Sequence, residues 1–425
     1  SPDATLGLRV ERMAGAIAHR GPDQAGVYVS PLGTGAMASR RLAICDIPTG
    51  PQPLTLAAAG RRITVCFNGE IYNYRDLAGG LRAGGAVLDT GCEAEVIALL
   101  YARDGASFLQ HLLGPFAIAI FDEPAGDSAP PRCLLARDRL GQKPLWVARL
   151  PGRIAFASEA KALLADEAID VRWDPTAIAH YAVMGYVPAP LSAFDGIEKL
   201  PAGSVLELTG PDAEPTRWYT PPACDAAMDD ASSADPVSAV REALERAVAD
   251  RLMADSGVPV GVLLSGGIDS AIVAALMARA TDRPIRTFTA GFAAAAYDER
   301  PAAAALAKHI GAEHTELVID PDPSGAIDRV AAMFDEPFAD SSALPTALIC
   351  QAASQHVKVA LVGDGGDEVF GGYDRYRAMM LAESLSPPAY LAARIGGPVA
   401  KLFAAKGERS KLRRFIRFAD SLPQP

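Results

Sequence analysis

The segment Ser265–Ser270, of sequence SGGIDS, constrains the fold of this chain more than any other stretch. It follows the nearly continuous apolar run Val260–Leu264, which predicts a strand over Val258–Leu264 that is buried on both faces. A helical pattern over Ala271–Arg279 begins directly after it. Glycines allow the backbone to approach an anion closely, and a helix N-terminus favours negative charge. The segment therefore predicts a phosphate-binding turn in a parallel α/β sheet, with an ordinary glycine-rich turn as the alternative.

A second glycine-rich turn, Gly363–Tyr373, has the sequence GDGGDEVFGGY and follows a predicted strand over Val357–Val362. Three acidic side chains among so many glycines are poor material for a hydrophobic core. In an open parallel sheet, the turns at the carboxyl ends of the strands lie together and bind ligands. We therefore expect both turns at one ligand site. A flexible acidic surface loop is the alternative for the second turn.

The chain divides into two halves of different pattern. Residues 1–208 contain short β-rich pieces such as Ile63–Phe67 and Phe116–Phe121, separated by glycine and proline, which predicts an α+β domain. Residues 209–236 are rich in proline, serine and acidic residues and are interpreted as a linker. Residues 237–425 alternate helical and strand patterns after a helix start at Asp235-Pro236, which predicts a parallel α/β domain.

Composition excludes some classes of function. A net charge of -11 argues against a nucleic-acid partner, because neutralising phosphates requires clustered lysine and arginine. No apolar run reaches the ~20 residues that a membrane-spanning helix needs, so no membrane partner is expected. The six cysteines show neither C-x-x-C nor metal-ligand spacing, which favours a reduced, cytoplasmic protein.

Taken together, SGGIDS and GDGGDEVFGGY resemble the synthetase domain of the glutamine-hydrolysing asparagine synthetase family, and Asp335–Thr346 resembles its bacterial branch. Five motifs of the first half resemble the glutaminase domain of the same family and occur in the family's order. They are His19–Asp23, Arg40–Ile44, Phe67–Asn73, Arg137–Gly141 and Ala157–Lys161. The resemblance covers residues from about 10 to 377.

The resemblance implies an α+β N-terminal-nucleophile (class II glutaminase) domain with an αββα sandwich, followed by an α/β parallel-sheet ATP pyrophosphatase domain. It also implies that ATP, together with Mg²⁺, activates the side-chain carboxylate of aspartate as an adenylate. Ammonia released from glutamine by a nucleophilic cysteine would open this adenylate to asparagine, AMP and pyrophosphate. The implied partners are the small molecules glutamine, aspartate and ATP, and a homodimer is left open.

Individual residues take their roles from the same resemblance. Asn68 and Gly69 would form the oxyanion hole, and Asp364 matches an acid linked to adenylate formation. The residues expected to bind glutamine are Arg41, Leu42, Ala43, Ile44, Cys45, Asn68, Gly69, Glu70 and Glu93. The residues expected to bind ATP are Leu263, Ser265, Gly266, Gly267, Asp269, Ser270, Ala290, Val362 and Gly363. A magnesium ion held with ATP would be bound by Asp269 and Asp367.

Two of these motifs have a plain structural alternative when each is considered alone. Arg41 is also consistent with a solvated surface arginine. Asn68-Gly69 is a favoured dipeptide of tight hairpins, so it is also consistent with a purely structural turn.

The sequence departs from the family pattern in three ways. No cysteine precedes Cys45, so the expected nucleophile is absent from this chain, and Glu93 stands where the family usually has aspartate. The synthetase domain is short at its C-terminus, where Lys401 and Lys406 do not match the family's lysine. We expect a missing segment at each end, the upstream one holding the cysteine. An amidotransferase acting on a sugar, peptide or secondary-metabolite carboxylate, and a non-catalytic sensor with decayed sites, remain as alternatives.

Overall fold

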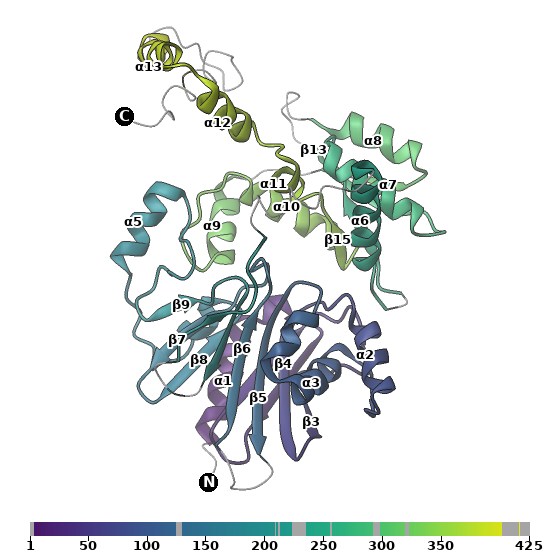
Figure 1. The fold of residues 1–425 in the computed structure, drawn as a ribbon, viewed down its shortest axis with the longest axis vertical. Coiled ribbons are helices and arrows are strands. Elements are labelled where there is room, and N and C mark those ends of the chain that lie inside the picture. The colour runs from purple at the N-terminus through teal and green to yellow at the C-terminus, as the bar shows by residue number, and fades with distance from the viewer. Residues whose placement is uncertain are drawn as a thin grey trace. The chain divides into compact units, whose positions relative to one another are not determined.

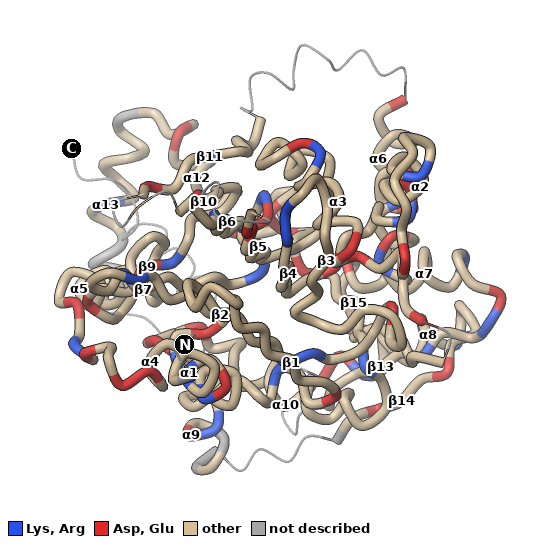
Figure 2. The backbone as a smooth tube through the Cα atoms, turned by 90° about the horizontal axis from the view of Figure 1, so that it is seen from below, with Lys and Arg blue, Asp and Glu red and all other residues tan. Residues whose placement is uncertain are grey.

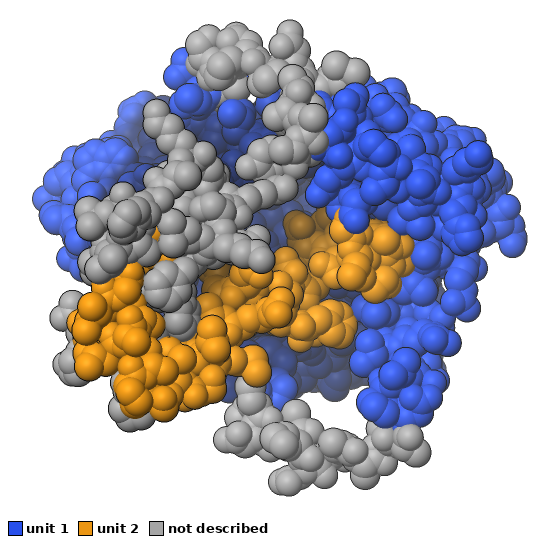
Figure 3. Space-filling view, turned by 90° about the horizontal axis from the view of Figure 1, so that it is seen from above, with its two compact units in different colours: residues 1–266, 274–361 blue, residues 267–273, 362–425 orange. Residues whose placement is uncertain are grey.

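The computed structural model describes residues 4–124, 130–208, 210, 213–222, 235–255, 257–291, 298–318, 323–401 and 416. Much of the predicted linker, together with Cys224 and Lys406, lies outside the described residues. The chain forms two compact units, coloured separately in Figure 3. The larger unit contains residues 1–266 and 274–361, and the smaller unit contains residues 267–273 and 362–425.

A six-stranded antiparallel sheet forms the centre of the first half (Figure 1). Its strand order is β11-β10-β6-β5-β4-β3. The strands are β3 (Leu54–Ala58), β4 (Arg61–Gly69), β5 (Phe116–Pro124), β6 (Arg132–Arg137), β10 (Ser204–Leu208) and β11 (Thr216–Arg217). The predicted strands Ile63–Phe67 and Phe116–Phe121 are confirmed as parts of β4 and β5.

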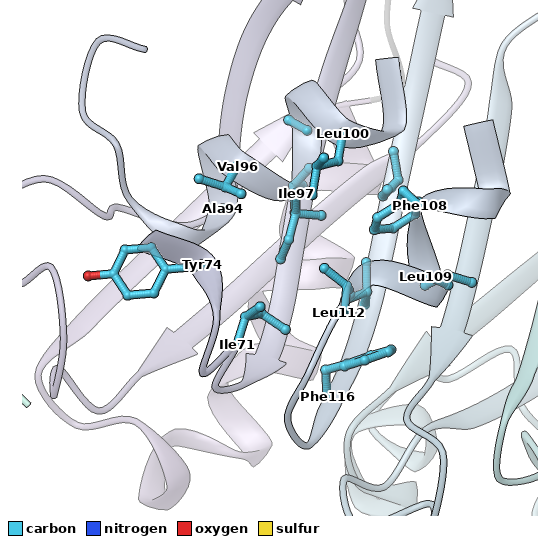
Figure 4. Close-up of a cluster of buried hydrophobic side chains, with 14 of the residues drawn as sticks. Ile71, Tyr74, Ala94, Val96, Ile97, Leu100, Phe108, Leu109, Leu112 and Phe116 are labelled. Atoms are coloured by element: carbon cyan, nitrogen blue, oxygen red, sulfur yellow. The ribbon is translucent and has the colours of Figure 1, made fainter. Parts of the chain in front are cut away.

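Alternation along β4 and β5 divides their side chains between two cores. Ile63 and Val65 of β4, with Ile118 and Ile120 of β5, pack under the helices α2 (Tyr74–Ala83) and α3 (Glu93–Asp104). Figure 4 shows this core, in which Ile97, Leu100 and Phe108 face the sheet. The intervening residues of β5, such as Ala119 and Phe121, pack on the opposite face. A strand with period 2 and both faces covered explains why the first six residues of β5, Phe116–Phe121, are all apolar.

The opposite face is covered by a second layer of strands. The hairpin β1 (Gln24–Val29) and β2 (Ala36–Arg41) and the three-stranded sheet β8-β7-β9 contribute Met37, Val147 and Phe156 to that core. Helices then cover the outer side of the second layer. The remaining elements are α1 (Ala4–Ala16), β7 (Trp146–Leu150), β8 (Arg153–Ala157), α4 (Ala160–Leu164), α5 (Pro175–Met184) and β9 (Ile197–Lys199), with short 3-10 turns at Ala18–Arg20 and Gly105–His111. The predicted αββα sandwich is thus confirmed.

The second half contributes a parallel sheet of strand order β14-β13-β12-β15. Its strands are β12 (Val260–Leu263), β13 (Arg286–Gly291), β14 (Glu313–Val318) and β15 (Val359–Leu361). Its helices are α6 (Pro236–Asp250), α7 (Ile268–Arg279), α8 (Arg300–His309), α9 (Pro323–Met333) and α10 (Ala343–Ala353). The predicted α/β alternation is confirmed, and Asp235 caps α6 by accepting the backbone N–H groups of Val237 and Ser238.

The strand order places a topological switch point between β12 and β15. Chain order runs from β12 outward to β13 and β14 on one side, and β15 then pairs with β12 on the other. Turns that leave the carboxyl ends of two such strands bind ligands in open α/β sheets. The two glycine-rich turns therefore follow the two strands where a ligand is expected.

Two predicted features differ in detail from the structure. β15 covers only Val359–Leu361 of the strand predicted over Val357–Val362, and it is an edge strand whose Ala360 is exposed. Residues 213–222 also pack on the first half, beyond the predicted boundary at residue 208. The Trp218 ring stacks on Phe116 with 6.0 Å between ring centroids, and its Nε1–H donates to the Arg137 carbonyl.

The smaller unit contains three described helices after β15: α11 (Gly366–Phe370), α12 (Asp374–Ser384) and α13 (Pro387–Lys401). Within the described ranges, no helix is both long enough and apolar enough to cross a membrane. Charges of both signs are interspersed along the described backbone (Figure 2).

Candidate active sites

Asn68 and Gly69 are the last two residues of β4, paired with Ala117 and Phe116 of β5. The chain then continues toward α2, so the hairpin alternative for this dipeptide is wrong. Gly69 has φ +147°, and a Cβ atom there would lie 2.1 Å from the carbonyl oxygen of Pro115. Only glycine fits this close backbone approach. The Asn68 Nδ2 is buried and has no hydrogen-bond partner among the described residues.

Arg41, at the end of β2, organises the loop that follows it. Its guanidinium donates to Gln24 Oε1 at 2.9 Å and to the carbonyl oxygens of Cys45 and Asp46. The solvated-surface alternative for Arg41 is therefore wrong. We call residues 42–50 the glutamine loop, because they include Leu42–Cys45, which are predicted to bind glutamine. Within it Ala43 and Cys45 are buried, whereas Leu42 remains partly exposed.

Three carboxyl groups gather at the glutamine loop: Asp46 lies within the loop, and Glu70 and Glu93 lie beside it. Glu93 begins α3, is buried, and accepts the Ile71 N–H at 2.7 Å. Asp46 accepts the Glu93 N–H at 3.2 Å. Burial raises the pKa of Glu70 to about 7. Burial, and then the charge of Glu70, raises the pKa of Glu93 well above its usual range. One Glu70 oxygen, Oε2, is buried without a partner in the described structure, so the group is poised to receive a cation.

We expect the free energy of unfolding of the ligand-free protein to fall as pH rises from about 4.5 toward 7. A carboxyl with a raised folded pKa binds more protons in the folded state than in the unfolded state across that window, so its stabilisation is lost as pH rises. Glu70→Gln cannot ionise, and its urea-derived stability should depend less steeply on pH. Glu207→Gln, on an exposed position of β10, is the control that should keep the wild-type slope. Equal slopes in wild type and Glu70→Gln would contradict the expectation.

Asp138 shapes a neighbouring turn within the predicted motif Arg137–Gly141, although the sequence assigned this residue no individual role. Its buried carboxylate accepts the backbone N–H groups of Leu140, Gln142 and Lys143 at 2.9–3.0 Å. Burial lowers the pKa of the Lys143 ammonium group. The negative charge of Glu70 acts in the opposite direction and raises this pKa. Lys143 therefore belongs to the electrostatic environment of Glu70.

In the larger unit, the chain leaves β12 through Leu264, Ser265 and Gly266. The Leu264 N–H donates to the Phe288 carbonyl at 2.8 Å, which continues the pairing of β12 with β13. A Cβ atom on Gly266 would lie 3.2 Å from the Cβ of Ala302 in α8, so this glycine lies close to the following helix. Leu263 ends β12 and Ala290 lies near the end of β13, both at the carboxyl edge of the sheet.

In the smaller unit, Asp269 packs directly against the second glycine-rich turn. A Cβ atom on Gly363 would lie 2.7 Å from the Ser270 backbone nitrogen, and one on Gly366 would lie 2.6 Å from the Asp269 Cγ. Asp364 is exposed in this turn. The Asp367 side chain folds back toward Gly372, where an added Cβ would meet its Oδ1 at 1.9 Å. The structure thus brings residues 267–270 and 362–366 together.

The two predicted metal ligands do not form a dense carboxylate cluster. The described part of the chain contains no group of three or more His, Cys, Asp or Glu side chains arranged to hold a metal ion. Asp269 and Asp367 therefore remain predicted ligands of a metal bound together with the nucleotide.

Comparison with known proteins identifies both halves. Residues 2–219 match the family model of the glutamine amidotransferase domain, and residues 239–422 match that of asparagine synthase. A putative glutamine-hydrolysing asparagine synthetase 2 of Methanocaldococcus jannaschii is 31% identical over 388 residues, which cover 86% of this chain and 72% of that protein. The chain belongs to the glutamine-hydrolysing asparagine synthetase family.

Bacterial relatives of this family are more similar in sequence but longer. A putative asparagine synthetase of Mycobacterium tuberculosis is 37% identical over 397 residues, covering 90% of this chain and 59% of the relative. Asparagine synthetase 1 of Bacillus subtilis is 33% identical over 371 residues, covering 87% of this chain and 56% of the relative. The chain thus spans somewhat more than half the length of these relatives.

Several residues that shape the asparagine synthetase family sites in this chain were missed from the sequence. Asp46 and Lys143 adjoin the glutamine-binding candidates, and Asp255 contacts the glutamine loop from the second half. Proximity in sequence to Leu42–Cys45 and to Arg137–Gly141 was the available signal for the first two. No local signal marks Asp255, because its contact depends on the tertiary fold.

Proposed function

We propose that this protein is a glutamine-dependent asparagine synthetase, which hydrolyses glutamine and amidates an ATP-activated aspartate to give asparagine, AMP and pyrophosphate. One observation supports it best. The same chain holds Asn68 Nδ2 and Glu70 Oε2, both buried and without a hydrogen-bond partner among the described residues, at one site, and two mutually packed glycine-rich turns after neighbouring parallel strands. The relatives are named as asparagine synthetases, which favours aspartate over other carboxylates as the acceptor.

At the glutaminase site, the proposed chemistry transfers the glutamine acyl group to a nucleophilic cysteine, as the family resemblance implies, with release of ammonia, and water then hydrolyses the thioester. The Asn68 amide and the Gly69 N–H would donate to the oxygen of the scissile side-chain amide as charge develops on it. The negative field of Glu70, Glu93 and Asp46 suits the α-ammonium group of glutamine, and Arg41 suits its α-carboxylate. Burial raises the pKa of Glu70 to about 7 in the ligand-free protein. The positive charge of a bound α-ammonium group would lower this pKa and so favour the ionised carboxylate.

At the second site, we propose that the turns after β12 and β15 bind ATP. Ser265, Gly266, Gly267 and Ser270 would surround the phosphates, and Asp364 would assist adenylate formation. Asp269 and Asp367 would hold Mg²⁺, which would neutralise phosphate charge there. The close packing of Gly363 and Gly366 against Asp269 supports this assignment, since it leaves no room for side chains between the two turns.

ATP–pyrophosphate exchange with a panel of carboxylates tests the proposal. We expect exchange that depends on aspartate, and asparagine formation with either glutamine or ammonium as the nitrogen donor. Exchange with another carboxylate but not with aspartate would identify a different amidotransferase of this scaffold. Absence of exchange with every carboxylate would favour a non-catalytic sensor. We further propose a cytoplasmic location and a homodimer, the latter to be checked by light scattering on the protein expressed from its natural reading frame.

A further inference from the structure

The glutamine loop is held by a carboxylate from the other half of the larger unit. Asp255 Oδ1 accepts the Asp46 N–H at 3.1 Å, and its Oδ2 accepts the Ile47 N–H at 2.8 Å. The Asp255 backbone N–H donates in turn to the Ile44 carbonyl at 3.0 Å. A carboxylate that accepts two adjacent N–H groups fixes the local backbone, and charge-assisted hydrogen bonds of this kind are the stronger ones.

Asp46, whose N–H donates to Asp255, has an unusual backbone conformation. Asp46 has φ +51°, a left-handed conformation that few residues other than glycine adopt. Its carbonyl oxygen accepts N–H groups from Arg41, Thr49 and Gly50. The conformation of Asp46 therefore contributes to where the Arg41 guanidinium lies, together with Gln24 and the Cys45 carbonyl, and Asp255 is one of the groups that maintain it.

A lysine from the same half of the chain, Lys358, contacts the N-terminal end of the glutamine loop. Lys358 Nζ donates to Asp23 Oδ2 at 2.7 Å and to the Ala43 carbonyl at 3.4 Å. The same Asp23 oxygen accepts the Ala43 N–H at 3.0 Å. Asp255 lies shortly before β12, and Lys358 directly before β15. These are the two neighbouring strands that lead into the glycine-rich turns.

We propose that Asp255 and Lys358 are positioning residues of the glutamine site, supplied by the synthetase half. They touch no substrate, but hold the glutamine loop so that Arg41 can receive the α-carboxylate. Asp255 precedes β12 and Lys358 precedes β15, and a glycine-rich turn of the proposed nucleotide site follows each of these strands. The residues before two strands therefore support the glutamine site, and the residues after the same strands form the proposed nucleotide site. This inference rests on the proposed function, in that it assumes glutamine binds beside Arg41.

The variant Asp255→Asn tests this inference, because it keeps the shape of the side chain but presents an N–H₂ group to one of the two loop N–H groups. Glutamine affinity would be measured by titration calorimetry on the protein expressed from its natural reading frame. We expect the glutamine Kd to rise about tenfold. Hydrogen exchange should show faster exchange at the amides of Asp46 and Ile47.

Glu336→Gln is the matched control. Glu336 also joins the two halves, through an ion pair with Lys199 and a hydrogen bond from the Ala193 N–H at 3.2 Å, but it does not contact the glutamine loop. It should keep the glutamine Kd within about twofold of wild type. A general loosening of the contact between halves would instead affect both variants alike, and would overturn the inference.

Lys358→Met provides a second, less buried variant, for which we expect a glutamine Kd about threefold higher than in wild type. Wild-type glutamine affinity in both Asp255→Asn and Lys358→Met would overturn the inference while leaving the proposed function intact. A wild-type protein that binds no glutamine would instead overturn the proposed function, and this inference with it.

Discussion

Replacing Gly69 by alanine is expected to lower the free energy of unfolding by about 3–5 kcal/mol and to abolish glutamine binding. An added Cβ atom would lie 2.1 Å from the Pro115 carbonyl oxygen and 2.8 Å from the Phe116 Cα. Both contacts are with backbone, which cannot move aside as a flexible side chain could. The φ of +147° adds strain for any residue with a Cβ atom. Urea denaturation and glutamine calorimetry measure the two effects.

Gly80→Ala is the control for this substitution. Gly80 lies in α2, is exposed, and an added Cβ atom would meet nothing within 4 Å. Alanine in a helix interior should raise stability by about 0.5–1 kcal/mol and leave glutamine affinity unchanged. A Gly69→Ala protein as stable as wild type would show that the end of β4 can move away from Pro115, contrary to this account.

Replacing Gly363 by alanine should reduce ATP–pyrophosphate exchange by about a hundredfold or more. The added Cβ atom would lie 2.7 Å from the Ser270 backbone nitrogen and 2.9 Å from the Asp269 backbone carbon. The turn at residues 267–270 would have to shift, and its backbone amides are the groups proposed to bind phosphate. Small displacements of positioned groups carry large costs in rate because the reaction depends on their alignment.

Glutamine binding gives this second experiment its internal control. An added Cβ atom on Gly363 would meet Asp269 and Ser270, and neither belongs to the glutamine loop or to Asn68–Glu70, so glutamine affinity should stay within about twofold of wild type. Loss of both activities together would indicate a global folding defect rather than a local one. Exchange within threefold of wild type would contradict the assignment of the turn to the nucleotide site.

Much of the architecture could be predicted because local patterns and tertiary contacts agree. Val260–Leu264 is a short apolar run between turn residues, so its strand could be predicted from the sequence, and β12 covers most of it. The degree of burial of β15 could not be predicted from the sequence, because a short apolar segment is compatible with a central strand or with an edge strand. Its edge position depends on which strand it pairs with.

The candidate sites divide in a similar way. Short motifs were enough to propose Asn68, Gly69 and Arg41 as site residues. The same letters also suited a hairpin turn at Asn68-Gly69 and a solvated surface arginine at Arg41. The register of β4 and the contacts of Arg41 decide between these interpretations. Trp218 lies beyond the predicted end of the first half because a single aromatic in a polar stretch gives no periodic signal. Asp255 and Lys358 lie in the other half of the chain from the loop they hold. A contact across so many residues has no local signature in one sequence.

The composition of the smaller unit has a consequence for synthesis on the ribosome. It joins residues 267–273 to a segment that begins only at residue 362. A nascent chain that has emerged as far as Leu361 can pair β12 with β13 and β13 with β14, but it lacks the Gly363 and Gly366 backbone against which Asp269 packs. The SGGIDS turn can therefore reach its final packing only after residues 362–366 have been translated. All strands of the αββα sandwich have been translated by then, so that domain can fold first.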